Sequence, residues 1–181
     1  MEPKLNSDKV DRMDLILKQR AERLAKEPPK GWEERKDLVE VVEFRLGDER
    51  FVVASTSVGE VLRSEEPSVV PCTPPYVAGM VNLRGRIVTV IDLKRLFGLQ
   101  GKGKSEERRV VVLRSGDLEV GLLVDSLEGM RNILFGDLRP PLPAMVGAYA
   151  AYVIGLEAEG AVVLDGERIL RDDSLIVDDR V

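Results

Sequence analysis

The sequence predicts an all-β domain of small barrels or sandwiches, preceded by an N-terminal α-helical extension. Three observations support this fold class. Many short apolar runs alternate with polar residues, turn signals recur roughly every 8–12 residues, and one hairpin pattern occurs twice along the chain. This combination is typical of all-β domains rather than of alternating βα units.

The first 38 residues differ in pattern from the rest of the chain. Their apolar residues step by three or four positions and would share one face of a helix; these residues are Val10, Met13, Leu17, Ala21 and Leu24. Pro28 and Pro29 would end the helix. Because the polar face mixes both signs of charge, the pattern fits either a solvated helix or an arm that docks on a partner.

A strand pattern begins after residue 38. Apolar and charged residues alternate over 42–46, Gly47-Asp48 indicates a turn, and the alternation resumes at 51–53, so we expect a β-hairpin. Two further apolar runs, 80–83 and 87–91, flank a second turn.

A short helix is expected next, over residues 93–97. Asp92 is placed to cap its start and Gly98 to end it. The polar, glycine-bearing stretch 100–107 predicts a loop between two halves of the chain.

The second half repeats the first. The hairpin pattern at 42–48 recurs at 111–117, an offset of 69 residues. Tyr76-Val77-Ala78-Gly79 recurs as Tyr152-Val153-Ile154-Gly155, an offset of 76 residues. The repeat predicts two related all-β units, each small for an independent core, so we expect the units to share strands or to pack tightly.

The composition excludes several kinds of chemistry. The 181 residues include no histidine and one cysteine, so a histidine base, a histidine-ligated metal and an intramolecular disulfide are all excluded. The net charge of -5 argues against sequence-independent nucleic-acid binding. No apolar run is long enough to span a membrane, and a signal-peptide pattern is lacking. We therefore expect a cytoplasmic protein without direct membrane insertion.

Candidate catalytic residues do not assemble into a site. Asp92, Asp125 and Asp165 each end a valine-rich run, but the βαβ alternation that normally carries phospho-accepting or Mg²⁺-binding aspartates is missing. The stretch 101–104 is glycine-rich and basic without P-loop spacing, and Cys72 has no evident activating group. We expect no enzymatic activity, no cofactor and no metal.

Two stretches of the first half carry a dense motif. One is Val58-Gly59-Glu60-Val61-Leu62-Arg63, and the other, 73–93, contains Pro74-Pro75-Tyr76, Asn82-Leu83-Arg84-Gly85 and Ile91-Asp92-Leu93. These motifs resemble those of the CheW family, the coupling proteins of bacterial chemosensory arrays. The stretches 120–125 and 152–155 also resemble the family, and the resemblance extends over about residues 40–178.

The resemblance implies a specific version of the predicted fold: two intertwined five-stranded β-barrels after the helical extension. We expect a CheW-like domain at residues 39–181, with a first barrel at about 39–99, a second at about 106–175, and strands exchanged between them. Three departures from the family pattern are Thr89 in place of a proline, Gly166 in place of a leucine, and the long extension.

The resemblance also implies a function and partners. Members of the family are adaptors that bind the cytoplasmic hairpin tip of chemoreceptors and the regulatory domain of the histidine kinase CheA, and their domains alternate with kinase domains in rings. By this resemblance we expect a cytoplasmic chemotaxis adaptor at receptor arrays, with other CheW-like domains as further partners.

Site residues follow from the same motifs. The resemblance implies receptor- or kinase-binding roles for Val58, Glu60, Val61, Asn82, Leu83 and Arg84. The first three would lie at a receptor groove between the barrels, with Arg84 near enough to pair with Glu60, and the kinase contact would lie on the barrel ends. Gly79 is expected at a close backbone approach, Gly85 at a turn and Asp92 at a helix cap.

Three alternatives remain open from the sequence. One is a CheW-like adaptor of surface motility or of another chemosensory-like pathway. Another is a fragment of a signalling enzyme, although an ATP-binding signature is lacking. The third is an RNA-binding small barrel, against which the acidic balance and the 4% aromatic content argue.

Overall fold

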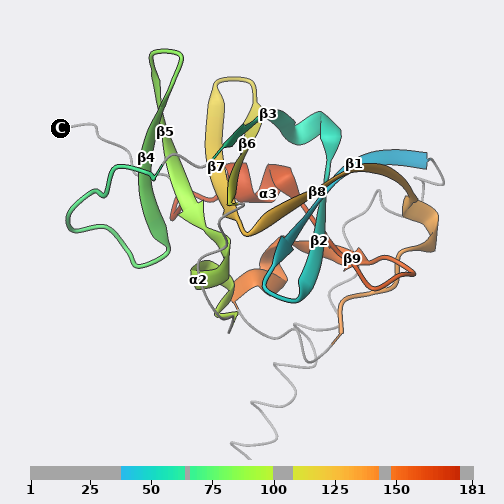
Figure 1. Cartoon of the computed structure of the whole chain (residues 1–181). Coiled ribbons are helices and arrows are strands. Elements are labelled where there is room, and N and C mark those ends of the chain that lie inside the picture. The colour runs from blue at the N-terminus through green and yellow to red at the C-terminus, as the bar shows by residue number, and fades with distance from the viewer. Residues whose placement is uncertain (1–37, 64–65, 100–107, 143–147, 176–181) are drawn as a thin grey trace, which may run out of the picture. The chain divides into compact units, whose positions relative to one another are not determined.

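The computed structural model describes residues 38–63, 66–99, 108–142 and 148–175 (Figure 1). These residues form two five-stranded sheets with short helices between strands, which confirms the expected all-β fold. The helix expected within residues 1–38 lies outside the described residues, and Leu38 begins the first strand.

The chain alternates hairpins with short helical turns. The strands are β1 (Leu38–Leu46), β2 (Glu49–Ala54), β3 (Val58–Arg63), β4 (Val77–Leu83), β5 (Arg86–Asp92), β6 (Arg109–Ser115), β7 (Leu118–Val124), β8 (Ser126–Leu134), β9 (Val153–Leu156) and β10 (Val162–Leu164). The α-helices are α2 (Leu93–Phe97) and α3 (Gly166–Leu170), and the 3-10 helices are η1 (Ser55–Ser57), η2 (Phe135–Asp137) and η3 (Ala148–Tyr152).

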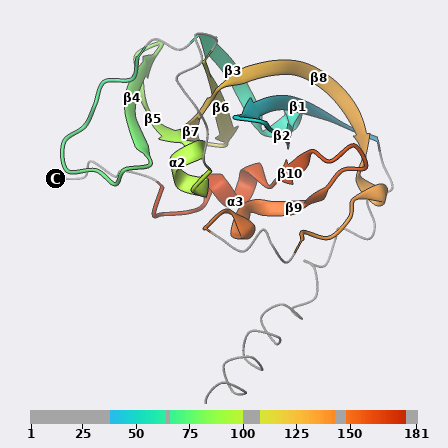
Figure 2. The same cartoon turned by 60° about the horizontal axis from the view of Figure 1, so that its bottom comes forward.

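Each sheet draws strands from both halves of the chain. One sheet, called barrel A here, has the order β8-β1-β2-β10-β9, and the other, barrel B, has the order β3-β6-β7-β5-β4. Two parallel pairs join the halves: β5 with β7 in barrel B, and β10 with β2 in barrel A. The halves are therefore intertwined, as the views of Figures 1 and 2 show. The residue limits expected for the two barrels remain a prediction.

The sequence repeat corresponds to a repeat in how the strands of the two barrels pair. Val41 pairs with Ala54 in barrel A, and Val110, 69 positions later, pairs with Leu123 in barrel B. The two edge strands β3 and β8 follow the same offset, because Leu62 pairs with Val110 and Arg131 pairs with Val41. These paired positions in one barrel thus have equivalents in the other.

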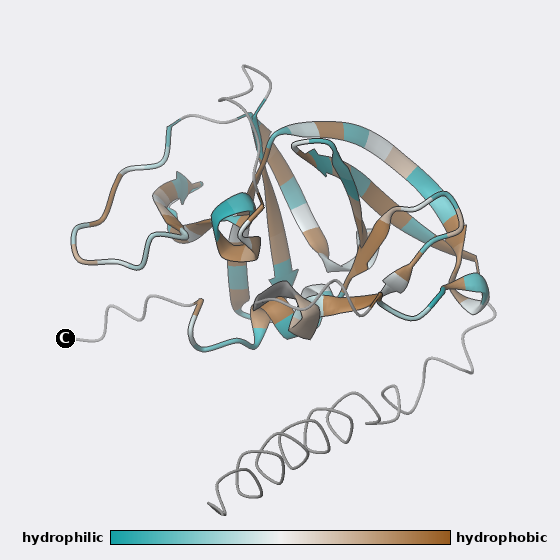
Figure 3. Ribbon diagram, turned by 90° about the horizontal axis from the view of Figure 1, so that it is seen from below, coloured by the Kyte–Doolittle hydropathy of each residue, from teal (hydrophilic) through white to brown (hydrophobic). Residues whose placement is uncertain are grey.

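The largest apolar core lies between the barrels. It takes residues from both sheets, and its central aromatic rings form a row, Phe44–Phe51–Phe97–Tyr152, with centroids 6.1, 5.8 and 6.3 Å apart. A smaller core that includes Leu83, Val90 and Val112 fills barrel B. Apolar and polar residues alternate along the strands in Figure 3, which is the period expected when one face of a strand is buried.

The two α-helices begin in the same way. Asp92 accepts a hydrogen bond from the backbone N–H of Arg95 at 3.2 Å, and Asp165 accepts from the N–H of Arg168 at 3.1 Å. Gly98 ends α2 with φ +65°. Gly166 stands where the family pattern has a leucine. In this chain a larger residue would clash, because a Cβ at position 166 would lie 2.9 Å from the Cβ of Ser57.

Gly79 lies where a loop crosses the edge of β4. Its φ is +144°, and a Cβ at this position would lie 2.3 Å from the carbonyl oxygen of Ser68. Ser68 and Met80 exchange two backbone hydrogen bonds of 2.9 Å across this crossing. At Gly155, the equivalent position in barrel A, an added Cβ would likewise lie 2.7 Å from the carbonyl oxygen of Arg139. Only glycine lets the loop bond this closely to the strand.

We predict that Gly79→Ala destabilises the domain by roughly 3 kcal/mol, because it adds a backbone clash to an unfavourable φ. Gly129→Ala is the control, since Gly129 has φ +124° but nothing within 4 Å of its added Cβ. We expect the control to lose only about 1 kcal/mol from backbone strain. Urea unfolding measures both values, and equal losses would contradict a steric role for Gly79.

Candidate functional site

The motif residues of β3 point to two different faces of barrel B. Val61 pairs with Val111, whose side chain lies in the core between the barrels, whereas Leu62 pairs with Val110 of the inner barrel core. A register shift between Val58 and Glu60 places Val58 on the same face as Val61, with Glu60 on the face of Leu62. The structure therefore separates the two valines from Glu60.

Glu60 and Arg84 connect the two edges of barrel B. The strands β3 and β4 lie at opposite ends of the sheet order, yet Arg84 Nη2 lies 3.2 Å from Glu60 Oε2. The gap between the two edge strands of one barrel is called its seam here. The Glu60 side chain is 19% exposed and that of Arg84 81% exposed, so the pair is worth little in the free protein.

Arg84 is held at the tip of a tight turn. Arg84 and Gly85 both have positive φ, +53° and +87°, and they form the two-residue connection between β4 and β5. The side-chain oxygen of Asn82 accepts a hydrogen bond from the N–H of Gly85 at 2.8 Å. Asn82 and Gly85 thus fix the turn that presents Arg84.

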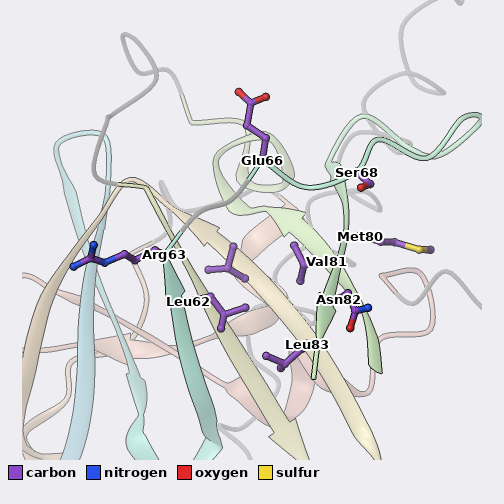
Figure 4. Close-up of a pocket in the computed structure, with 9 residues that line it drawn as sticks. Leu62, Arg63, Glu66, Ser68, Met80, Val81, Asn82 and Leu83 are labelled. Atoms are coloured by element: carbon purple, nitrogen blue, oxygen red, sulfur yellow. The ribbon is translucent and has the colours of Figure 1, made fainter. Parts of the chain in front are cut away.

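A pocket of about 460 Å³ opens along the seam of barrel B. Its lining residues are Leu62, Arg63, Glu66, Ser68, Met80, Val81, Asn82, Leu83 and Val110. Figure 4 shows Leu62, Val81 and Leu83 gathered between β3 and β4, with Arg63 and Met80 pointing away from them. The floor of the pocket is therefore apolar and its margin is polar, as in many binding sites.

Apolar side chains are also exposed along the outer edges of the two sheets. Val61 on β3 is 37% exposed, and Leu127 and Met130 on β8 are 37% and 60% exposed. Met130 pairs with Val42 and Leu127 with Phe44, so both lie on the face of barrel A that carries the shared core. These three side chains are called the apolar rim here.

A second apolar surface lies at one end of barrel B. Ile87 lies near the start of β5 and Leu118 begins β7, and these two parallel strands are neighbours in the sheet. Ile87 is 65% exposed and Leu118 41% exposed. An ion pair of 2.8 Å between Arg86 and Glu119 joins the same two strands, and Figure 1 shows the hairpins β4–β5 and β6–β7 projecting side by side.

Barrel A closes its seam with charged residues. Arg131 on the edge strand β8 donates to Glu43 and forms an ion pair with Glu157, just beyond the opposite edge strand β9, at 3.2 Å. Glu43 is 7% exposed and also pairs with Arg50 at 3.5 Å. The hydrogen bond to Glu157 is the main reason that the pKa of Arg131 lies above its usual range. The cation therefore compensates a nearly buried carboxylate.

The end of the described chain is held by two tyrosines. Tyr152 donates to the Asp172 carboxylate, and Tyr76 donates to the carbonyl of Ser174 at 2.8 Å. Burial, followed by the bond to Asp172, raises the pKa of Tyr152. Hydrogen bonds from Ser174 and then from Tyr152 lower the pKa of Asp172. The ionised Asp172 therefore stabilises the fold above the ordinary carboxyl pKa, and that contribution is lost as the pH falls through the folded-state value.

Sequence reasoning missed three parts of this site. Leu62 belongs to the motif stretch 58–63 but was given no role there, and its position next to Val61 in a strand was the available signal that it lies on the other face. The exposure of Ile87 had no clear signal, because apolar residues occupy both faces of its strand, as Ile87-Val88 and Val90-Ile91 show. The pairing of Arg131 with Glu157 required knowledge of which strands form the edges of barrel A.

Two further observations concern the described residues. They contain no group of three or more acidic or cysteine side chains arranged to hold a metal ion. No helix among them is long and apolar enough to cross a membrane.

Paired barrels that present edge strands, an apolar seam and an exposed hairpin end define a protein-binding module. The CheW-like domain family matches residues 40–174. The chain is 30% identical to the chemotaxis protein CheW of Klebsiella aerogenes, over 76% of this chain and 85% of that protein. It is 29% identical to the chemotaxis protein CheW of Helicobacter pylori, over 78% and 87% of the two chains.

The crystal structure of the scaffolding protein TtCheW from Thermoanaerobacter tengcongensis has the same fold. Its TM-score is 0.65 at 29% identity, and the match covers 71% of this chain and 90% of that one. The chain belongs to the CheW family, a family of scaffolds and adaptors, and it is a chemotaxis coupling adaptor. The comparisons do not favour the surface-motility adaptor or the signalling-enzyme fragment.

We predict that Arg131→Met destabilises the protein by about 2 kcal/mol, because it leaves Glu43 nearly buried with Arg50 as its remaining cation. Arg171→Met is the control, since its ion pair with Glu167 has side chains that are 73% and 57% exposed. The control should lose less than about 0.5 kcal/mol. Chemical denaturation compares the two variants, and a loss for Arg131→Met no larger than that of the control would contradict the prediction.

Proposed function

We propose that this adaptor couples the cytoplasmic hairpin tip of chemoreceptors to the regulatory domain of the histidine kinase CheA, in the cytoplasm at receptor arrays. It does so without catalysing a reaction: its influence passes through contacts and geometry. The observation that carries the proposal is the family motif, which folds into an exposed arginine anchored across the seam of barrel B by Glu60. Other CheW-like domains are proposed as neighbours in the same arrays.

The receptor surface is proposed to comprise β3 and the adjoining turn. Val61 belongs to the apolar rim, and Glu60, Asn82, Leu83 and Arg84 gather at the seam. Val58 holds β3 in place, because it packs against the core between the barrels. A receptor helix would lay its apolar face against such side chains. Burial by the partner would strengthen the Glu60–Arg84 pair, which is exposed to water in the free protein.

The kinase surface is proposed to be the end of barrel B formed by Ile87 and Leu118. Exposed apolar side chains on neighbouring strands are typical of protein contacts. The Arg86–Glu119 ion pair supplies a polar margin. This surface adjoins the receptor surface, because Ile87 pairs with Asn82 across the β4–β5 hairpin, so one adaptor could hold receptor and kinase side by side.

We predict that Arg84→Glu keeps the fold but lowers binding to a receptor cytoplasmic fragment at least about tenfold, because it sets two carboxylates against each other at the seam. Arg171→Glu is the matched control, since it reverses an exposed arginine that directly follows α3. Co-purification with receptor fragment and kinase measures complex yield. A wild-type yield from Arg84→Glu would contradict the assignment of Arg84 to the receptor surface.

A separate variant tests the kinase surface. We predict that Ile87→Glu lowers affinity for the kinase regulatory domain at least about tenfold, because it places a charge at the centre of an apolar contact, and that receptor affinity stays within about twofold. Val69→Glu is the control, because Val69 is an apolar residue that is 83% exposed elsewhere on the domain. Titration calorimetry gives both affinities, and unchanged kinase affinity for Ile87→Glu would move the kinase contact to another surface.

A further inference from the structure

The two seams can be compared position by position. The register of β3 on β6 and of β8 on β1 makes Leu62 equivalent to Arg131, through their partners Val110 and Val41. The hairpins β4–β5 and β9–β10 correspond in the same way. Gly79 pairs with Val90 as Gly155 pairs with Val163, so Val81, two positions after Gly79, is equivalent to Glu157.

The chemistry at these equivalent positions is opposite. In barrel A the two edges are joined by Arg131 and Glu157, with Glu43 beneath them. In barrel B the same three positions are Leu62, Val81 and Val112, all of them apolar. Leu62 and Val81 pack against the inner core of that barrel, and both line the pocket. The barrel A edges are joined by an ion pair, whereas an apolar pocket lies between those of barrel B.

We propose that the seam of barrel B receives one leucine-sized apolar side chain from the receptor tip, and that the seam of barrel A is closed to such a contact. This inference rests on the proposed function and assigns the occupant of the seam. Each adaptor would then offer a single seam site, although the fold supplies two equivalent seams.

Three observations support this occupant. The pocket is continuous with the proposed receptor surface, because Asn82 and Leu83 line it and Arg84 follows them directly. The floor is apolar, and a leucine entering it would replace water with contacts to Leu62, Val81 and Leu83 (Figure 4). The Arg84 side chain, 81% exposed, stands at the end of the same strand, so an acidic residue beside the entering leucine would meet a cation.

The test transfers the barrel A chemistry to barrel B. The double variant Leu62→Arg with Val81→Glu should bind a receptor cytoplasmic fragment at least about tenfold more weakly than wild type, because an ion pair would occupy the pocket. Binding to the kinase regulatory domain should stay within about twofold. The matched control, Thr56→Arg with Ala158→Glu, adds the same two charges at exposed positions and should leave both affinities unchanged.

Circular dichroism and calorimetric titration of the full chain decide the result. A folded double variant with wild-type receptor affinity would overturn the assignment of the seam and leave the proposed function standing. If the double variant does not fold, Leu62→Ala replaces it, with an expected loss of at least about threefold; unchanged affinity would again overturn the inference. Failure of the wild-type protein to bind the receptor fragment would overturn the proposed function itself, and the occupant with it.

Discussion

The parallel pairing between the two halves of the chain is the interaction on which the rest of the structure depends. Strand β5 adds to β7, and β10 adds to β2, so neither half completes a sheet alone. Each half is too small to bury a sufficient core by itself. Exchange of strands solves this problem, because it creates a shared core between two sheets in addition to the core inside barrel B. The surfaces proposed to bind partners then depend on the positions of the edge strands that remain.

The edge strands are where the surfaces of the two barrels differ. In both barrels a loop crosses the strand after a glycine, at Gly79 and Gly155, and covers part of the exposed edge. The remaining edge positions differ between the barrels. Arg131 and Glu157 close one seam with charge, whereas Leu62 and Val81 leave an apolar pocket in the other. The two equivalent seams are therefore chemically unlike, as the proposed role of joining different partners requires.

Much of the fold could be predicted, because its signals are local. The hairpin at 42–53, the cap at Asp92 and the turn at Arg84-Gly85 each depend on residues that are neighbours in sequence. The pairing of Glu60 with Arg84 was expected from a family motif, and the two side chains are close in the structure. The face of Val58 was not predictable, because the register shift beside Gly59 reverses the alternation that a regular strand would have.

The sequence by itself determined that the chain is a two-fold repeat of short strands with the motifs of a coupling adaptor, and its lack of histidine ruled out several chemistries. Alternation, turns and caps carry that information, since they act over a few residues. Tertiary structure alone decided which strands became edges, and so which side chains meet across a seam. Leu62 is far from Val81 in the chain, and Arg131 is far from Glu157. The sequence pattern around an apolar strand residue such as Ile87 also does not distinguish a buried side chain from an exposed one. Long-range pairing assigns those side chains to core or surface, and the proposed binding surfaces depend on that assignment.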